Sequence, residues 1–173
     1  MTETAPSKGA AHSKMEQIVR QPRPPDHWML WRYAQHLFHS YGELWLGRGD
    51  ADRALAYAEE CLALAEPSNS TKNIVKACRL RGQALLAQER LVEAEREIAR
   101  ALQLAQELGN PPQLWKTQAA LGELRRAQGK AEEARLAYQA AVTTIDQVAR
   151  SLGDATLHST FLSSAHVRQI CVC

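Results

Sequence analysis

Two small sets of residues in this chain have the types and spacing of metal ligands. His36 and His39 are three residues apart, which places two imidazoles on the same face of a helix. Cys171 and Cys173 stand at the C-terminus, not far from His166. The pattern brings no third histidine, cysteine or aspartate beside the first pair, and chain ends are disordered by default. We therefore predict no metal site and no cofactor.

Residue patterns that support catalysis are missing from the sequence. It contains no GxSxG, HExxH or GxGxxG segment, and no nucleophile with an obvious base. The acidic pairs Glu59–Glu60 and Glu132–Glu133 fall on stretches that we expect to face solvent. We predict that the chain is not an enzyme and that it has no catalytic residues.

The composition narrows the class of partner. The 173 residues include 21 basic and 19 acidic ones, a net charge of +2, so no clustered positive field favours nucleic acid. The N-terminus lacks an apolar segment, and no apolar run reaches the ~18 residues of a membrane span. The four cysteines have no disulfide-framework spacing. We expect a cytoplasmic protein with free thiols, no membrane and no nucleic-acid partner.

The elements that position these residues recur along the chain. Gly42, Gly82 and Gly122 stand forty residues apart. The same step separates Ala54, Ala94 and Ala134, and again Cys61, Ala101 and Ala141. A period of 20–50 residues is typical of stacked supersecondary units.

Hydrophobic periodicity and capping residues divide each unit into two helices. Asp26, Asp50, Ser70 and Asn110 are suitable N-cap residues, and Gly109 is suited to end a helix. No stretch of alternating β-branched residues indicates a strand. The sequence predicts an all-α fold with helices over about 26–47, 50–65, 71–88, 91–108, 111–128 and 131–151.

The same pattern sets the expected domain limits. Residues 1–24 are rich in Ser, Ala, Pro and Lys and are predicted to be a disordered tail. Residues 25–170 form the domain, with repeats over about 26–66, 70–108 and 110–151. A single short helix within 154–170 is expected to cap the stack with Leu157, Phe161 and Leu162.

The small residues have a common explanation. Two antiparallel helices approach closely only where their contact positions are small, so each glycine of a first helix is expected to meet an alanine of the second. Cys61, Ala101 and Ala141 are expected to face the next pair. A plain helical bundle with regular hairpins is the alternative.

The arrangement resembles the tetratricopeptide repeat (TPR), whose pattern is W-x2-L-G-x2-Y followed by A-x3-F and a later Ala. Matching positions are Phe38, Tyr41, Gly42, Trp45, Ala54, Ala58 and Cys61; Cys78, Gly82, Leu85, Ala94, Ile98 and Ala101; and Leu121, Gly122, Ala134, Tyr138 and Ala141. Arg81, Gln118 and Arg125 depart from it. The resemblance implies an α-solenoid of three helical hairpins.

The forty-residue period, longer than the usual thirty-four, adds a second resemblance. It is similar to the TPR-like arrays at the C-termini of bacterial LuxR-type activators and nucleotide-cyclase-linked signalling ATPases. The phrases ALQLAQELGNPPQLWKTQAALGELRRAQGKAEEA and ARSLGDATLHSTFLSSAHVRQI carry this likeness. The sequence has no GxxxxGK[ST] loop and no candidate helix-turn-helix, so this resemblance implies a detached regulatory or sensor arm.

In TPR stacks the first helices line a concave groove that holds a partner helix or an extended peptide. The glycine register places nine polar residues of this chain there, namely His36, His39, Glu43, Lys76, Arg79, Gln83, Lys116, Glu123 and Arg126. The groove would be mildly basic and could hold carboxylates by charge-assisted hydrogen bonds. The alternative is that these residues are ordinary solvated helix faces. The resemblance implies a non-catalytic module that binds a protein or peptide partner.

An aromatic cluster lies in the first predicted helix. Trp31, Phe38, Tyr41 and Trp45 recur at helical spacing and are expected to face the second helix as core. The alternative is an exposed patch on the leading edge of the first repeat. Such exposed repeat ends are candidates for a homodimer contact.

Overall fold

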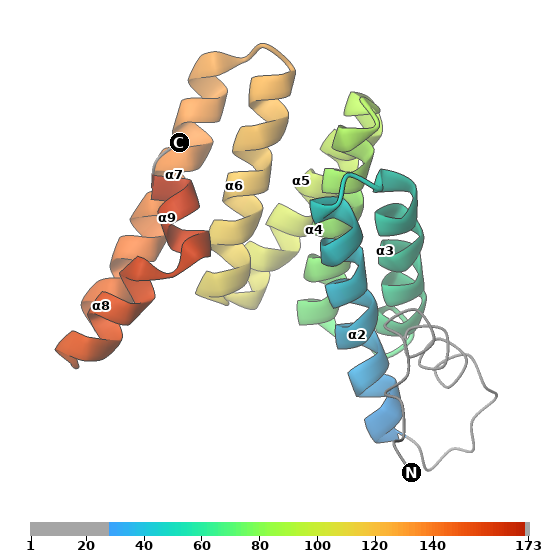
Figure 1. Cartoon of the computed structure of the whole chain (residues 1–173), viewed down its shortest axis with the longest axis horizontal. Coiled ribbons are helices and arrows are strands. Elements are labelled where there is room, and N and C mark those ends of the chain that lie inside the picture. The colour runs from blue at the N-terminus through green and yellow to red at the C-terminus, as the bar shows by residue number, and fades with distance from the viewer. Residues whose placement is uncertain (1–27, 172–173) are drawn as a thin grey trace, which may run out of the picture.

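The chain is all-helical over the part that the computed structural model describes, residues 28–171 (Figure 1). No strand occurs in that part, and neighbouring helices pack in pairs, as predicted. The expected tail and the candidate cap Asp26 lie outside the described residues. The helices are α2 (Trp28–Gly47), α3 (Ala51–Ala65), α4 (Thr71–Ala87), α5 (Leu91–Leu108), α6 (Pro111–Ala127), α7 (Ala131–Ser151), α8 (Ala155–Ser163) and α9 (Ala165–Cys171).

Local chemistry fixes several of the helix ends. The side chains of Asp50 and Asn110 each accept a hydrogen bond from the backbone N–H three residues later, at 3.0 and 3.3 Å. Each bond satisfies one of the free donors of a helix N-terminus. Gly109 ends α5 with a φ of 61°, a left-handed conformation that glycine adopts at little cost. Ser70 begins α4 without a capping bond from its side chain.

The glycines at the forty-residue step lie where two helices come closest. A methyl group added at Gly82 in α4 would lie 2.6 Å from Cγ1 of Ile98 and 3.3 Å from the carbonyl oxygen of Ala94, both in α5. A methyl group at Gly122 in α6 would lie 2.8 Å from ring atoms of Tyr138 in α7. Glycine at these two positions therefore makes room for a large side chain of the second helix, and the expected contact with an alanine is limited to the backbone oxygen of Ala94.

The first two pairs of helices also pack on each other, at Gly42 and at two buried cysteines. The nearest side chain to Gly42 in α2 belongs to Leu80 of α4, in the next pair. Cys61 and Cys78 are fully buried in the core between the two pairs, as free thiols. Burial raises the pKa of each thiol to about 12, so neither forms a thiolate near neutral pH.

Arg81, which departs from the repeat pattern, forms ion pairs between three helices. Its guanidinium in α4 lies 3.7 Å from Glu97 of α5 and 4.0 Å from Glu59 of α3. Glu97 is 8% exposed, so its carboxylate depends on this cation for compensation. An apolar side chain at the arginine position would remove that compensation.

The two departures in the third pair are explained in the same way. Arg125 in α6 lies 2.6 Å from Glu95 of α5 and 3.0 Å from Glu133 of α7. Gln118 accepts a hydrogen bond of 3.1 Å from the hydroxyl of Thr144 in α7. Polar contacts between helices thus replace the apolar contacts that the repeat pattern would supply.

The aromatic cluster of α2 contributes to the core. Phe38 is fully buried, and Tyr41 and Trp45 are half-buried against the same cluster. The ring of Tyr57 in α3 lies 6.1 Å from that of Phe38 and 5.5 Å from that of Tyr41. Tyr33, nearer the start of the helix, is exposed. The expectation of a core cluster is confirmed for the phenylalanine, while the side chain of Trp31 lies outside the described residues.

The C-terminal cap differs from the single helix that the sequence predicts. Two short helices, α8 and α9, are separated at Ser164, whose extended backbone ends the first of them. Phe161, Leu162 and the buried Val167 pack on the core of the third pair, as a cap should. Leu157 does not, because its side chain is 59% exposed. The prediction was wrong in assigning all three apolar residues of α8 to the interface.

Candidate functional site

The first helices of the three pairs, α2, α4 and α6, form one side of the stack. Each contacts the next, whereas the second helices α3, α5 and α7 make no comparable contacts with one another within the described residues. The first helices also run in the same direction (Figure 1). We call the nine residues assigned by the glycine register the A-helix face: His36, His39, Glu43, Lys76, Arg79, Gln83, Lys116, Glu123 and Arg126.

Members of the A-helix face differ widely in exposure. His36, Glu43 and Arg126 are exposed, and Lys76, Gln83, Lys116 and Glu123 are half-buried. His39 and Arg79 are 5% and 4% exposed. The latter two therefore belong to the interior beneath the face, and the exposed and half-buried residues are the ones available to a partner.

Arg79 is fixed by hydrogen bonds between α4 and α6. One terminal nitrogen donates to Oε1 of Gln113 at 3.0 Å and to the hydroxyl of Thr117 at 3.4 Å. Burial lowers the pKa of this arginine to about 10, against the opposing effect of the Glu43 carboxylate. It remains cationic at neutral pH and acts as a fixed charge.

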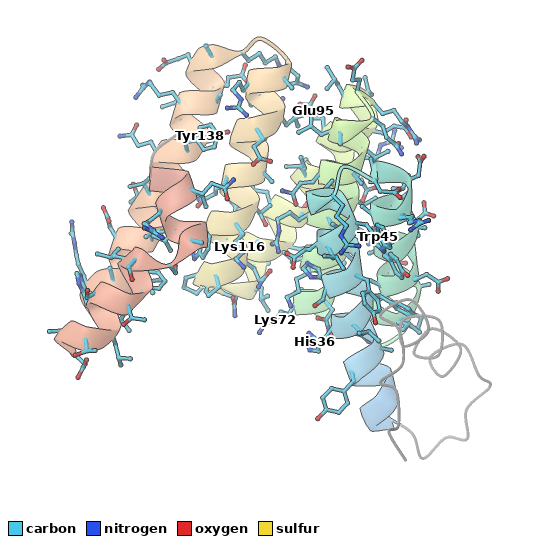
Figure 2. The ribbon with its side chains drawn as sticks, in the orientation of Figure 1. His36, Trp45, Lys72, Glu95, Lys116 and Tyr138 are labelled. Carbon is cyan, nitrogen blue, oxygen red and sulfur yellow. The ribbon has the colours of Figure 1, made fainter. Side chains whose placement is uncertain are left out.

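Lys76 and Lys116 occupy the same repeat position on α4 and α6. Burial lowers the pKa of both lysines. The positive charge of Arg79 lowers both further, and Lys72 adds to the effect on Lys76. The Glu43 carboxylate opposes both shifts. Figure 2 shows Lys72, Lys116 and His36 near the same end of the three first helices.

His39 is a buried neutral histidine. Burial and the nearby positive charge of Arg79 lower its pKa to about 3. Its Nδ1 lies 3.4 Å from a carboxylate oxygen of Glu43, one turn later on α2. Its Nε2 is buried without a hydrogen-bond partner in the described part of the chain.

Acidic residues lie further along the first helices. Glu123 in α6 accepts a hydrogen bond of 3.5 Å from the amide of Gln83 in α4. Burial raises the pKa of this glutamate, while Gln83 and Arg126 oppose the shift. The A-helix face is therefore basic in the first half of its helices and mixed in the second half.

A row of buried polar residues lies beneath the face and was not predicted from the sequence. Asn73 donates to the side-chain oxygen of Gln35, which links α4 to α2. Gln113 accepts from Arg79, which links α6 to α4. Asn73 and Gln113 stand forty residues apart, so the repeat register could have found them. These bonds fix the relative position of neighbouring first helices.

A metal ion has little support from this arrangement. His36 and His39 lie on one helix, but only the first is exposed. No group of three or more His, Cys, Asp or Glu side chains in the described ranges could hold a metal ion. The side chains of His166 and the two C-terminal cysteines are outside those ranges.

No protein-family model and no curated protein matches the chain. Among the helices that the structure describes, none combines the length and apolar character needed to cross a membrane.

Proposed function

We propose that this chain is a non-catalytic protein-interaction module, a TPR-like α-solenoid that binds a partner helix or peptide along the A-helix face. Support for the solenoid comes from the close glycine contacts and from the first helices packing on one another. A stack whose first helices lie on one side presents a continuous surface of side chains from several units.

The observation that carries the binding proposal is the uncompensated charge of this surface. Two helices contribute the cations of this surface, which are Lys76 and Arg79 on α4 and Lys116 on α6. The carboxylate whose charge raises the pKa of all three is Glu43. By contrast, Arg81 and Arg125 are matched by glutamates of neighbouring helices. The ammonium group of Lys116 lies 5.4 Å from the ring centre of Trp115, which supplies a cation–π contact but no negative charge. Half-buried lysines are costly unless an anion completes the site.

Affinity capture from the native host tests the proposal. The tagged chain is compared with Lys76→Glu/Lys116→Glu, which reverses the two half-buried charges of the A-helix face. Arg96→Glu/Arg150→Glu is the matched control, because it reverses two exposed charges on second helices. Arg79 is left intact since its burial would confuse binding with folding.

A partner that is retained by wild type and by the control, and lost from the lysine variant, supports the module. Partners retained equally by all three proteins would contradict binding through this face. Circular dichroism melts of the three proteins verify that each is folded.

A further inference from the structure

One face of α2 is exposed although the equivalent faces of α4 and α6 are buried. We call its four residues, which share one side of the helix, the leading stripe: Tyr33, Leu37, Ser40 and Leu44. The forty-residue register aligns them with Asn73, Ala77, Leu80 and Ala84 of α4, and with Gln113, Thr117, Ala120 and Leu124 of α6, all of which are buried. In the leading stripe, Tyr33 is 66% and Leu44 is 44% exposed, Ser40 is exposed, and Leu37 is half-buried.

In the second and third pairs, this face packs against the pair before it. Leu80 of α4 supplies the side chain nearest to Gly42 of α2. Leu124 of α6 lies in one core cluster with Leu85 and Ile98 of the second pair. Within the described residues no helix precedes α2, so the leading stripe has no preceding pair against it. It is an apolar face of the kind that this fold covers with another helix.

The other end of the stack is closed. Phe161 and Leu162 of α8 and Val167 of α9 pack on the core of the third pair, and this cap and the first pair lie at opposite ends of the molecule (Figure 1). Because the cap occupies that end, the leading stripe of one copy cannot extend the stack onto the third pair of another. A second copy can cover the leading stripe with its own, which is a two-fold contact that closes at a dimer.

The leading stripe is complementary to itself when two copies of α2 lie antiparallel. A two-fold axis beside Ser40 sets Leu37 of each copy opposite Leu44 of the other, so the same apolar contact forms twice. The small side chain of Ser40 lies at the centre, where it allows the two helices to approach closely. A two-fold contact requires this reciprocity between the residues on either side of the axis.

Charge favours the same antiparallel arrangement. The leading stripe carries no charged residue, and Arg48 is exposed just beyond its end, with its guanidinium carbon 5.3 Å from the ring centre of Trp45. Antiparallel helices bring Arg48 of each copy toward the exposed ring of Tyr33 in the other, where a cation–π contact can form. Parallel helices would instead set the two arginines side by side and align the two helix dipoles.

We infer that two copies of this chain associate through their leading stripes, with α2 antiparallel to α2 across a two-fold axis beside Ser40. The second copy takes the place that a preceding pair takes against α4 and α6. The inference goes beyond the proposed function, and the contact uses none of the nine residues of the A-helix face.

Sedimentation velocity of the full chain under reducing conditions tests the inference. A contact made by one helix from each copy is at the small end of interface sizes, so the series extends to about 0.5 mM protein. Wild type should pass from monomer to dimer as its concentration rises, without larger species. Circular dichroism melts verify that each variant below is folded.

Leu44→Glu should weaken the dimer by about tenfold or more, because each copy would bring an unpaired carboxylate against Leu37 of the other. Leu136→Glu is the matched control, since it changes a leucine of similar exposure, 52%, on the second helix α7. The control should dimerise as wild type does.

Disulfide cross-linking tests the register of the contact. A residue beside a two-fold axis meets its own copy, so Ser40→Cys should form a covalent dimer under mild oxidation. The two C-terminal cysteines are changed to serine in this experiment, and Cys61 and Cys78 are buried. Ser159→Cys, at an exposed serine of α8, is the control and should stay monomeric.

Four outcomes would overturn the inference. A wild-type chain that is monomeric at the highest concentration would mean that another segment of the chain or a different protein covers the leading stripe. Growth beyond the dimer would indicate a head-to-tail contact. A dimer that is equally strong with Leu44→Glu, or a cross-link at Ser159→Cys and not at Ser40→Cys, would place the contact elsewhere on the molecule.

Discussion

Gly82→Ala is the substitution that most directly probes how the helical pairs are built. Its new methyl group would lie 2.6 Å from Cγ1 of Ile98 and 3.3 Å from the backbone oxygen of Ala94. Ile98 is fully buried and, being β-branched, has a stiff first torsion, so the clash requires α4 and α5 to separate. Overpacking of this kind costs about 1–3 kcal/mol.

The opposing effect is helix propensity, which favours alanine over glycine by about 1 kcal/mol. Gly47→Ala in α2 is the matched control, because nothing lies within 4 Å of the added methyl group. The control should be neutral or stabilising. The free energy of unfolding of Gly82→Ala should fall about 1–3 kcal/mol below that of the control, or roughly 2–10 °C in melting temperature for a domain of this size.

Urea unfolding followed by circular dichroism measures both variants. If Gly82→Ala is as stable as Gly47→Ala, the close approach of α4 and α5 is not a packing requirement, and the glycine register loses its structural explanation.

Three further predictions concern buried groups. The unfolded chain protonates His39 near pH 6.5 but the folded chain only near pH 3, so stability should fall below pH 6.5 as acid favours unfolding. The free energy of unfolding falls by about 2 kcal/mol at pH 5 because of this group. His39→Gln lacks this contribution, so its urea midpoint should fall less between pH 7 and pH 5 than that of wild type. Arg81→Leu should lower the free energy of unfolding by about 1–3 kcal/mol because it leaves the carboxylate of Glu97 uncompensated. Adding Glu97→Leu should recover most of this loss in the same urea assay. A second, additive loss would refute the pairing of the two residues. With the two C-terminal cysteines changed to serine, Cys61 and Cys78 should react with iodoacetamide only as fast as the chain opens, and rapid native-state labelling would contradict their burial.

The helices and their boundaries followed from local chemistry, so the sequence was a good guide to them. Asp50 and Asn110 cap as predicted because an N-cap bond spans only three residues. The two helices of the cap were not predicted, because the break at Ser164 carries no glycine or proline to indicate it.

The candidate site was harder to predict because burial depends on neighbours from other repeats. The register placed Arg79 correctly on α4, but its burial arises from Gln113 and Thr117 of α6. In the same way, Arg81 departs from the repeat pattern, and its role becomes clear only from its glutamate partners on α3 and α5. A single sequence gives the position of such a residue on its helix and not the partner that it meets.

The proposed binding face is tested most directly by mapping a captured partner on the isotope-labelled chain by NMR. Backbone amide shifts should change around Lys76, Gln83 and Lys116 on α4 and α6, and Lys76→Gln/Lys116→Gln should abolish the changes. Changes confined to the second helices α3, α5 and α7, or to α8, would contradict binding along the first helices.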